Sequence, residues 1–142
     1  MARGEHFACL WAGDSRAYLL RDGVLTRITR DHSLVQELVD AGEIAESEAE
    51  GHPRANVITR AVGDSSEAVE LDKITDRVLS GDRFLLCSDG LTKILDDTAI
   101  TEILHSGGAE PAADALLTAA LARRATDNVT AVVVEVSADA NF

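Results

Sequence analysis

Short hydrophobic runs alternate with polar turns along the chain, and strand-like runs dominate its first half. The segment HFACLWAGD (6–14) predicts a buried strand that stops at Gly13-Asp14. RAYLL and VLTRIT flank Asp22-Gly23, a dipeptide typical of a hairpin turn. The other runs that predict strands are NVITRAVG (56–63), EAVELDKIT (67–75), RFLLCS (83–88) and TAVVVEV (130–136).

Helical patterns lie in the middle and toward the end of the chain. In DHSLVQELVDAG (31–42) the apolar residues recur at helical spacing, and either Asp31 or Ser33 can cap the helix before Gly42 ends it. The other segments that predict helices are EIAESEAEGHP (43–53, short and acidic), DDTAITEILHSGG (96–108) and EPAADALLTAALARR (110–124). Strands followed by two helices and a last strand indicate an α+β fold. Runs that are apolar on both faces predict central strands covered on both sides.

Length and charge limit the classes of function. The 142 residues fit a single domain, 1–142, and the formal net charge of −12 excludes nucleic acid and anionic membrane surfaces as main partners. The acidity suits divalent cations, although it is also what a soluble surface shows. Cys9 and Cys87 lie in apolar runs, which favours buried thiols over a disulfide. With neither a signal-like segment nor a membrane span in the pattern, we expect a cytoplasmic location.

Three acids lie where a predicted strand meets a turn. Asp14 follows ACLWAG, Asp89 follows FLLCS, and Asp127 precedes NVTAVVVEV. If the three strands lie side by side, the carboxylates converge and suit Mg²⁺ or Mn²⁺. Each acid also fits an ordinary turn, because Asp-Gly and Asp-Asn are common turn dipeptides. The pattern alone leaves a metal site and three turn residues as alternatives.

Four short motifs occur in an order that carries a resemblance. They are GDSR (13–16), DHS (31–33), SDGL (88–91) and DNVT (127–130). Together with the strands around them, they resemble the bacterial metal-dependent serine/threonine phosphatases of the PP2C type, also called the PPM family. The resemblance covers about 7–136 of the chain. HFACLWAGDSR and DHSLVQELVDAG are similar to the phosphatases encoded with type VI secretion systems.

This resemblance implies a fold and a chemistry. The chain would form half of a layered α-β-β-α sandwich with mostly antiparallel strands. Two or three Mn²⁺ or Mg²⁺ ions would activate a water molecule that hydrolyses phosphoserine or phosphothreonine on a protein substrate. Asp89 and Asp127 would hold the metal pair, Asp14 a further cation, and Asn128 would support the ligands or fix their turn. Segment Glu43 to Arg60 matches the family's variable flap, and no substrate-binding residue is assigned.

The resemblance also implies that a part of the family's domain lies outside this chain. The family's N-terminal half carries an Asp-Gly motif that bridges the metals, and MARGEHF has no such pair. We therefore expect the chain alone to have little or no activity and uncertain metal occupancy. Uncovered sheet edges predict a homo-oligomer or pairing with a missing N-terminal half. The alternative function is a non-catalytic pseudophosphatase or protein-interaction module.

Two residues of these motifs have competing interpretations. Arg16 is either a phosphate clamp or a strand arginine paired with a nearby acid. His32 is either a proton shuttle or metal ligand, or a residue that fixes the turn before the helix. Trp11 is expected in the core.

Overall fold

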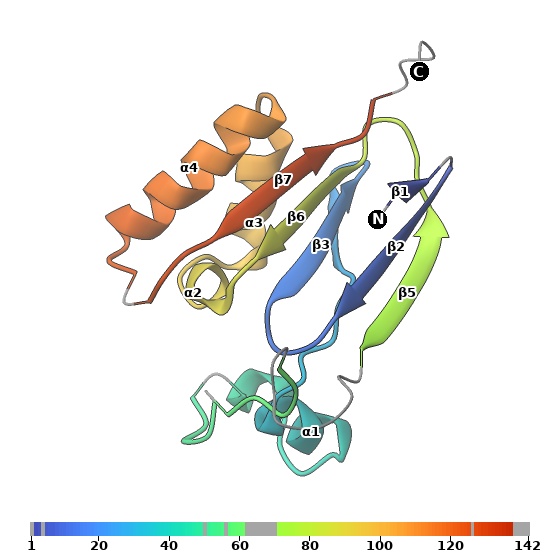
Figure 1. Cartoon of the computed structure of the whole chain (residues 1–142). Helices are drawn as coiled ribbons and strands as arrows, with labels where there is room; N and C mark the ends of the chain where they lie inside the picture. The colour runs from blue at the N-terminus through green and yellow to red at the C-terminus, as the bar shows by residue number, and fades with distance from the viewer. Residues whose placement is uncertain are drawn as a thin grey trace.

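The computed structural model describes residues 2–3, 5–49, 51–55, 57–61, 71–125 and 127–137. Strands and helices follow the order that the sequence predicts, strands first and helices before the last strand (Figure 1). The strands are β1 (Ala2–Arg3), β2 (His6–Trp11), β3 (Arg16–Arg21), β4 (Val24–Arg27), β5 (Asp72–Arg77), β6 (Arg83–Cys87) and β7 (Ala131–Glu135). The helices are α1 (Leu34–Asp40), the 3-10 helix η1 (Glu46–Glu48), α2 (Asp89–Thr92), α3 (Asp97–His105) and α4 (Ala109–Ala122).

The larger sheet has four antiparallel strands in the order β4-β3-β6-β7. Tyr18 of β3 lies opposite Leu85 of β6, and both side chains point to the face that α2, α3 and α4 cover. Figure 1 shows α3 and α4 along this sheet. The core here is apolar and consists of Tyr18, Leu20, Leu85, Cys87, Leu91, Leu95, Ile100, Leu104, Ala112, Leu116 and Ala120. Burial of this many apolar side chains is the main stabilising contribution to the fold.

The smaller sheet, β1-β2-β5, is also antiparallel and packs beside the other face of the larger one. Phe7 of β2 contacts Phe84 of β6 edge-to-face, with ring centroids 4.9 Å apart. Arg21 of β3 joins the two sheets, because its guanidinium binds the buried carboxylate of Asp82 and also donates to the carbonyl of Arg77 in β5. The arrangement is the α+β, antiparallel pattern that the sequence predicts, with helices on one face and a second sheet on the other.

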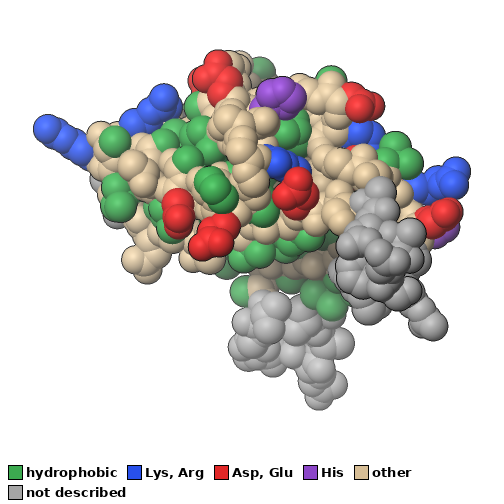
Figure 2. Space-filling view, turned by 90° about the horizontal axis from the view of Figure 1, so that it is seen from above, with side chains coloured by type: hydrophobic (Ala, Val, Ile, Leu, Met, Phe, Trp, Pro, Cys, Tyr) green, Lys and Arg blue, Asp and Glu red, His purple; other side chains and the backbone are tan. Residues whose placement is uncertain are grey.

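A part of the sheet surface stays exposed. Leu86, Val132 and Val134 lie on the face of β6 and β7 that the helices do not cover, and each is 44–50% exposed. Hydrophobic side chains also reach the surface in the view from above (Figure 2). The prediction that these runs are covered on both sides is therefore wrong for this face.

Three other predictions differ from the structure. In the described part of the acidic segment, 43–49 and 51–53, one 3-10 turn, η1, takes the place of the predicted helix. Its closely spaced glutamates repel, and none of the three residues of η1 is buried. Residues 57–61 form an isolated bridge between Ile58 and Ser33 instead of a strand, and Val57 and Ile58 are both 45% exposed. The strand predicted at 67–75 is β5, which runs from Asp72 to Arg77 in the structure. Positions 67–70 of the prediction lie outside the described residues. None of the helices that the structure describes is long and apolar enough to cross a membrane.

Candidate metal centre

Asp14 and Asp89 come together at one end of the larger sheet. Asp14 lies in the turn between β2 and β3, and Asp89 is the first residue of α2, directly after β6. Burial raises the pKa of the Asp14 carboxyl, and the neighbouring carboxylates of Asp89 and Asp31 raise it further. Like charges held this close destabilise one another, and a divalent cation between them removes that repulsion. The donor set therefore fits a metal ion that prefers oxygen ligands.

Strand β6 and the short helix after it place Asp89. Ser88 keeps an extended backbone (φ −77°, ψ 164°) as the residue before α2, so the chain turns from strand to helix at Asp89. Asp89-Gly90 fits an ordinary turn dipeptide in the sequence, whereas in the structure Gly90 is a buried helical residue. The ammonium group of Lys93 lies 3.1 Å from the Asp89 carboxylate, one helical turn later. Asp89 is thus held at the start of a helix with one cation already beside it.

The turn that carries Asp127 packs against Gly90, the residue after Asp89. A Cβ built on Gly90 would lie 2.2 Å from the Asn128 carbonyl oxygen and 3.5 Å from the Cβ of Asp127. Ser88 fixes the same turn, since its hydroxyl donates to the Asn128 carbonyl (3.3 Å) and accepts from the Thr130 amide (3.0 Å). The exposed Asp127 carboxylate accepts from the Asn128 amide at 2.8 Å. The two segments are in contact, and Asn128 contributes through its backbone.

The three acids are not equally close. The carboxylates of Asp14 and Asp89 interact, and both residues line the same cleft. Asp127 is not among the residues that line this cleft, and its Cβ lies close to Gly90. Among the residues that the structure describes, no group of three or more His, Cys, Asp or Glu side chains is arranged to hold a metal ion. The metal roles of Asp14, Asp89 and Asp127 stay predictions.

The cleft beside Asp14 and Asp89 has a volume of about 890 Å³. One wall comes from the flap-like segment and the helix before it, and the other from the acids and α2. The residues of the first wall are Val35, Gln36, Val39, Glu46, Ser47, Ala49, His52 and Ala55. Thr92, Lys93 and Asp97 also line the cleft, and they were not predicted as site residues because none of the four motifs contains them.

Arg16 also lines this cleft, and its charge is already paired. Its Nε and Nη2 atoms donate to the two oxygens of Asp31 at 3.0 and 2.8 Å, and Nη1 donates to the Tyr18 hydroxyl at 3.2 Å. Burial is the largest single influence and disfavours the charged guanidinium, but the hydrogen bonds to Asp31, the charge of Asp31 and the contact with Tyr18 together outweigh it and raise the pKa of Arg16 above its ordinary value. Of the two interpretations of Arg16, the structure has the arginine paired with a local acid.

His32 fixes the turn that carries Asp14. Its Nδ1 accepts from the amide of Gly13 at 3.0 Å, and its Nε2 lies 2.7 Å from an oxygen of Asp72. The sequence interpretation placed this role at the turn before α1, whereas in the structure the His32 ring holds a different turn, the one between β2 and β3. Asp72 was missed in the sequence, where it is only one polar position of an alternating strand.

The structure also decides between Asp31 and Ser33 as the cap of α1. Ser33 caps α1, because its hydroxyl accepts from the Gln36 amide at 3.2 Å. Asp96 caps α3 in the same way, accepting from the Ala99 amide at 2.8 Å.

Comparison with known proteins places this geometry in a family. No family model matches the chain. The serine/threonine protein phosphatase PstP of Mycobacterium tuberculosis is 43% identical over 133 residues, which are 94% of this chain and 26% of PstP. The serine/threonine phosphatase stp of Listeria monocytogenes is 44% identical over 124 residues, 87% of this chain and 49% of that protein. The chain therefore spans about half or less of the length of these relatives.

Solved structures agree with the sequence relatives. PppA of Pseudomonas aeruginosa, described as a key regulatory component of the type VI secretion system, has a TM-score of 0.84 at 50% identity and covers 94% of this chain. The catalytic domain of PstP in complex with two manganese ions has a TM-score of 0.85 at 40% identity. This chain covers 54% of the PppA chain and 56% of the PstP chain. The chain belongs to the PP2C-type serine/threonine phosphatase family.

Proposed function

We propose that this chain supplies part of the metal centre of a phosphatase that hydrolyses phosphoserine and phosphothreonine on proteins. The observation that carries the proposal is the approach of Asp14 and Asp89, from motifs GDSR and SDGL, at a cleft of about 890 Å³. The names of the relatives and the two manganese ions of the PstP complex support the same chemistry.

Mn²⁺ or Mg²⁺ is the cofactor that we propose, in a site of two or three ions when complete. Asp14, Asp89 and Asp127 are the residues of this chain that would hold them, with Asn128 fixing the turn. When bound, the ions would activate a water molecule for attack on phosphorus and neutralise charge on the phosphoryl oxygens. Asp14 and Asp89 would contribute charge and orientation, and the Lys93 ammonium group lies 3.1 Å from the Asp89 carboxylate.

We further propose that the chain is one partial domain, 1–142, with little or no activity alone. Two converging carboxylates do not complete the shells of two octahedral ions, and the chain spans about half of its solved relatives. The exposed side chains of Leu86, Val132 and Val134 would pack against an N-terminal phosphatase half or a second copy of the chain. We also propose a cytoplasmic location, since Cys9 and Cys87 are both free thiols, as is usual in a reducing compartment.

A fusion tests this function directly. The N-terminal part of the Listeria phosphatase is joined ahead of this chain, and release of phosphate from a phosphothreonine peptide is measured with Mn²⁺. We expect hydrolysis by the fusion, none above background by the chain alone, and loss of hydrolysis in the fusion that carries Asp89→Asn. The fusion with Asp22→Asn is the matched control, because Asp22 lies in the hairpin turn away from the cleft.

Two results would contradict the proposal. A correctly folded fusion that binds phosphopeptide without hydrolysing it would favour the alternative, a non-catalytic interaction module. Robust Mn²⁺-dependent hydrolysis by the chain alone would show that the missing half is not required.

A further inference from the structure

We infer that His32 is a positioning residue for Asp14, held in place by Asp72 and acting through the backbone of Gly13. The inference rests on the proposed function, in which Asp14 holds a cation. It concerns three residues that lie outside the carboxylate cluster itself, and it connects the smaller sheet to the metal centre.

Gly13 is bound to His32 twice. Its amide donates to His32 Nδ1 at 3.0 Å, and its carbonyl accepts from the His32 amide at 2.8 Å. Gly13 has a φ of 107°, in the region that favours glycine, and a Cβ there would lie 3.3 Å from the Arg60 carbonyl. The two peptide units that flank the Gly13 Cα are therefore both held, the first by the His32 ring and the second by the His32 amide. A rotation at Gly13 would move the Asp14 carboxylate relative to Asp89.

The imidazole can do this in only one tautomer. Nδ1 must be unprotonated to accept from Gly13, so Nε2 carries the hydrogen and donates to Asp72 at 2.7 Å. Removing the Asp72 acceptor takes away the hydrogen bond that favours this tautomer. Asp72 acts on Gly13 although it does not touch it.

The ring has no freedom to leave this position. His32 is 6% exposed and stacks on Trp11, with centroids 6.1 Å apart and an interplanar angle of 11°. Trp11 is itself fixed by a hydrogen bond from its indole nitrogen to the Arg30 carbonyl at 2.8 Å. It is a half-buried support for His32 and not a fully buried core residue.

Asp72 is in turn held by Arg60, the last residue of the flap-like segment Glu43 to Arg60. Arg60 donates to its second oxygen at 3.0 Å, and the hydrogen bonds from His32 and Arg60 lower the pKa of Asp72. The carbonyl of His32 also accepts from the Thr59 amide at 2.9 Å. The chain of contacts therefore runs from Arg60 through Asp72 and His32 to Gly13.

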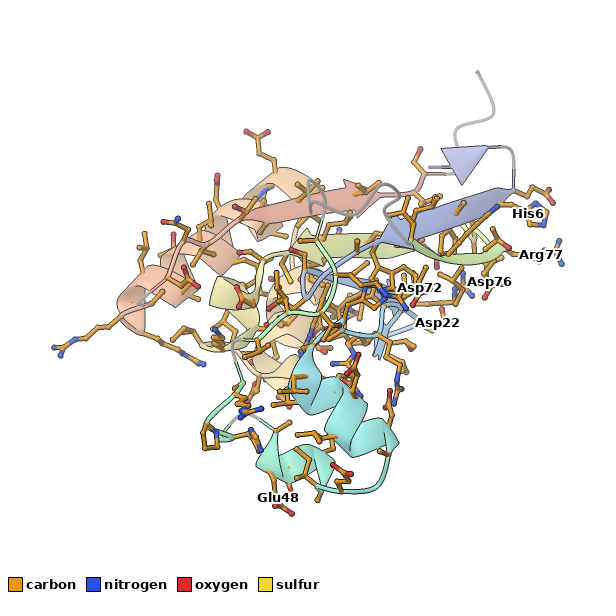
Figure 3. All side chains as sticks on the ribbon, turned by 60° about the horizontal axis from the view of Figure 1, so that its bottom comes forward. His6, Asp22, Glu48, Asp72, Asp76 and Arg77 are labelled. Carbon is orange, nitrogen blue, oxygen red and sulfur yellow. The ribbon has the colours of Figure 1, made fainter. Side chains whose placement is uncertain are left out.

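The test changes Asp72, because it is 45% exposed and its replacement leaves the buried ring in place. Asp72→Ala removes the acceptor, and Asp72→Asn keeps an oxygen that can accept from Nε2. Asp76→Ala is the matched control, since it removes the same charge from the other end of β5, as Figure 3 shows. All variants are made in the full chain labelled with ¹⁵N.

Two readouts separate positioning from general stability. The first is the ¹⁵N–¹⁵N coupling across the Gly13 N–H to His32 Nδ1 hydrogen bond, with hydrogen exchange of the Gly13 amide, in metal-free chain. The second is the affinity for Mn²⁺ followed by electron paramagnetic resonance. We expect Asp72→Ala to lose the coupling, to speed exchange at Gly13 and to weaken Mn²⁺ binding about tenfold. Asp72→Asn should restore most of each, and Asp76→Ala should match wild type.

The inference is overturned if Asp72→Ala keeps the Gly13 coupling and exchange rate of Asp76→Ala. It is also overturned if the coupling is lost while Mn²⁺ affinity stays that of wild type. If the wild-type chain binds no Mn²⁺ at all, the metal proposal fails, and the Gly13 signals alone decide whether His32 and Asp72 position this turn.

Discussion

Gly90 and Asn128 lie so close that position 90 has no room for a side chain. A Cβ there would be 2.2 Å from the Asn128 carbonyl oxygen, far inside contact distance. This contact places the start of α2, with Asp89, against the turn that carries Asp127. The glycine of the SDGL motif is therefore required by close approach, although its backbone is helical.

Replacing Gly90 by alanine should destabilise the chain. In an exposed helix the same change stabilises by up to about 1 kcal/mol, because alanine has the higher helix propensity. Here the clash with Asn128 should reverse the sign and lower the free energy of unfolding by about 1–3 kcal/mol, the range typical of overpacking. Urea unfolding followed by circular dichroism measures it. Gly51→Ala is the control, since nothing lies within 4 Å of its Cβ, and an equal effect at both positions would contradict the account.

The ion pair between Arg21 and Asp82 should make stability depend on pH. Asp82 is 1% exposed and accepts from Arg21 at 2.9 and 2.6 Å and from the Leu79 amide at 2.8 Å. The hydrogen bonds from Arg21 are the main cause of the lowered pKa of Asp82. Because the folded pKa lies below the unfolded one, this stabilisation is complete above the ordinary carboxyl pKa of about 4 and disappears as pH falls through the folded value.

Asp82→Asn should therefore lose about 2 kcal/mol of unfolding free energy at neutral pH. Its stability should also fall less steeply than that of wild type below about pH 4. Urea unfolding at several pH values measures both quantities. A variant with the stability and acid sensitivity of wild type would show that the pair does not hold the two sheets together.

The metal-free chain should become more stable when Asp14 is made neutral. Burial and Asp89 raise the pKa of Asp14, so its ionised form opposes folding at neutral pH. The penalty shrinks as pH falls below the raised folded-state pKa and is gone below the ordinary carboxyl pKa of about 4. Asp14→Asn removes the charge and should raise the melting temperature at neutral pH without metal. The same change at Asp22, in the exposed hairpin turn, should leave it unchanged. A lower melting temperature for Asp14→Asn would contradict the charge-repulsion account.

Much of the fold follows from the sequence pattern. Alternation and turn residues give the hairpin around Asp22-Gly23, where both residues have the positive φ that such a turn requires (52° and 76°). Helical spacing gives α1, α3 and α4. The pattern does not predict α2, because its four residues are too few to show a period. It also predicts a strand at 57–61, where the structure has only an isolated bridge and the apolar residues stay exposed.

The candidate site could be predicted only in part. Asp14 and Asp89 were predicted because each follows an apolar run that predicts a strand, and the motifs contain the same residues. The roles of Asp72 and of the Gly90 contact depend on residues 40 and 38 positions away, His32 and Asn128, and no local pattern contains that information. Long-range pairs of this kind become visible only when the sheets are assembled.

The exposed face of β6 and β7 should promote self-association. Val132 and Val134 are 50% and 44% exposed on an edge strand next to Leu86. We expect the chain to form dimers or larger assemblies in sedimentation experiments at high concentration, and the double change Val132→Thr and Val134→Thr to shift it toward monomer. Val24→Thr, on the other edge strand, is the control. A monomeric wild-type chain at high concentration would contradict the prediction.

Binding of Mn²⁺ to the metal-free chain tests the central claim, that Asp14 and Asp89 form a cation site, most directly. Isothermal titration calorimetry of wild type is compared with Asp14→Asn, Asp89→Asn and the turn variant Asp22→Asn. We expect Mn²⁺ binding by wild type and Asp22→Asn. At a free Mn²⁺ concentration a hundred times the dissociation constant, binding should raise the free energy of unfolding of these two proteins by about 2.7 kcal/mol. Asp14→Asn and Asp89→Asn should each lose it. The same affinity in all four proteins, or no binding by wild type, would contradict the assignment.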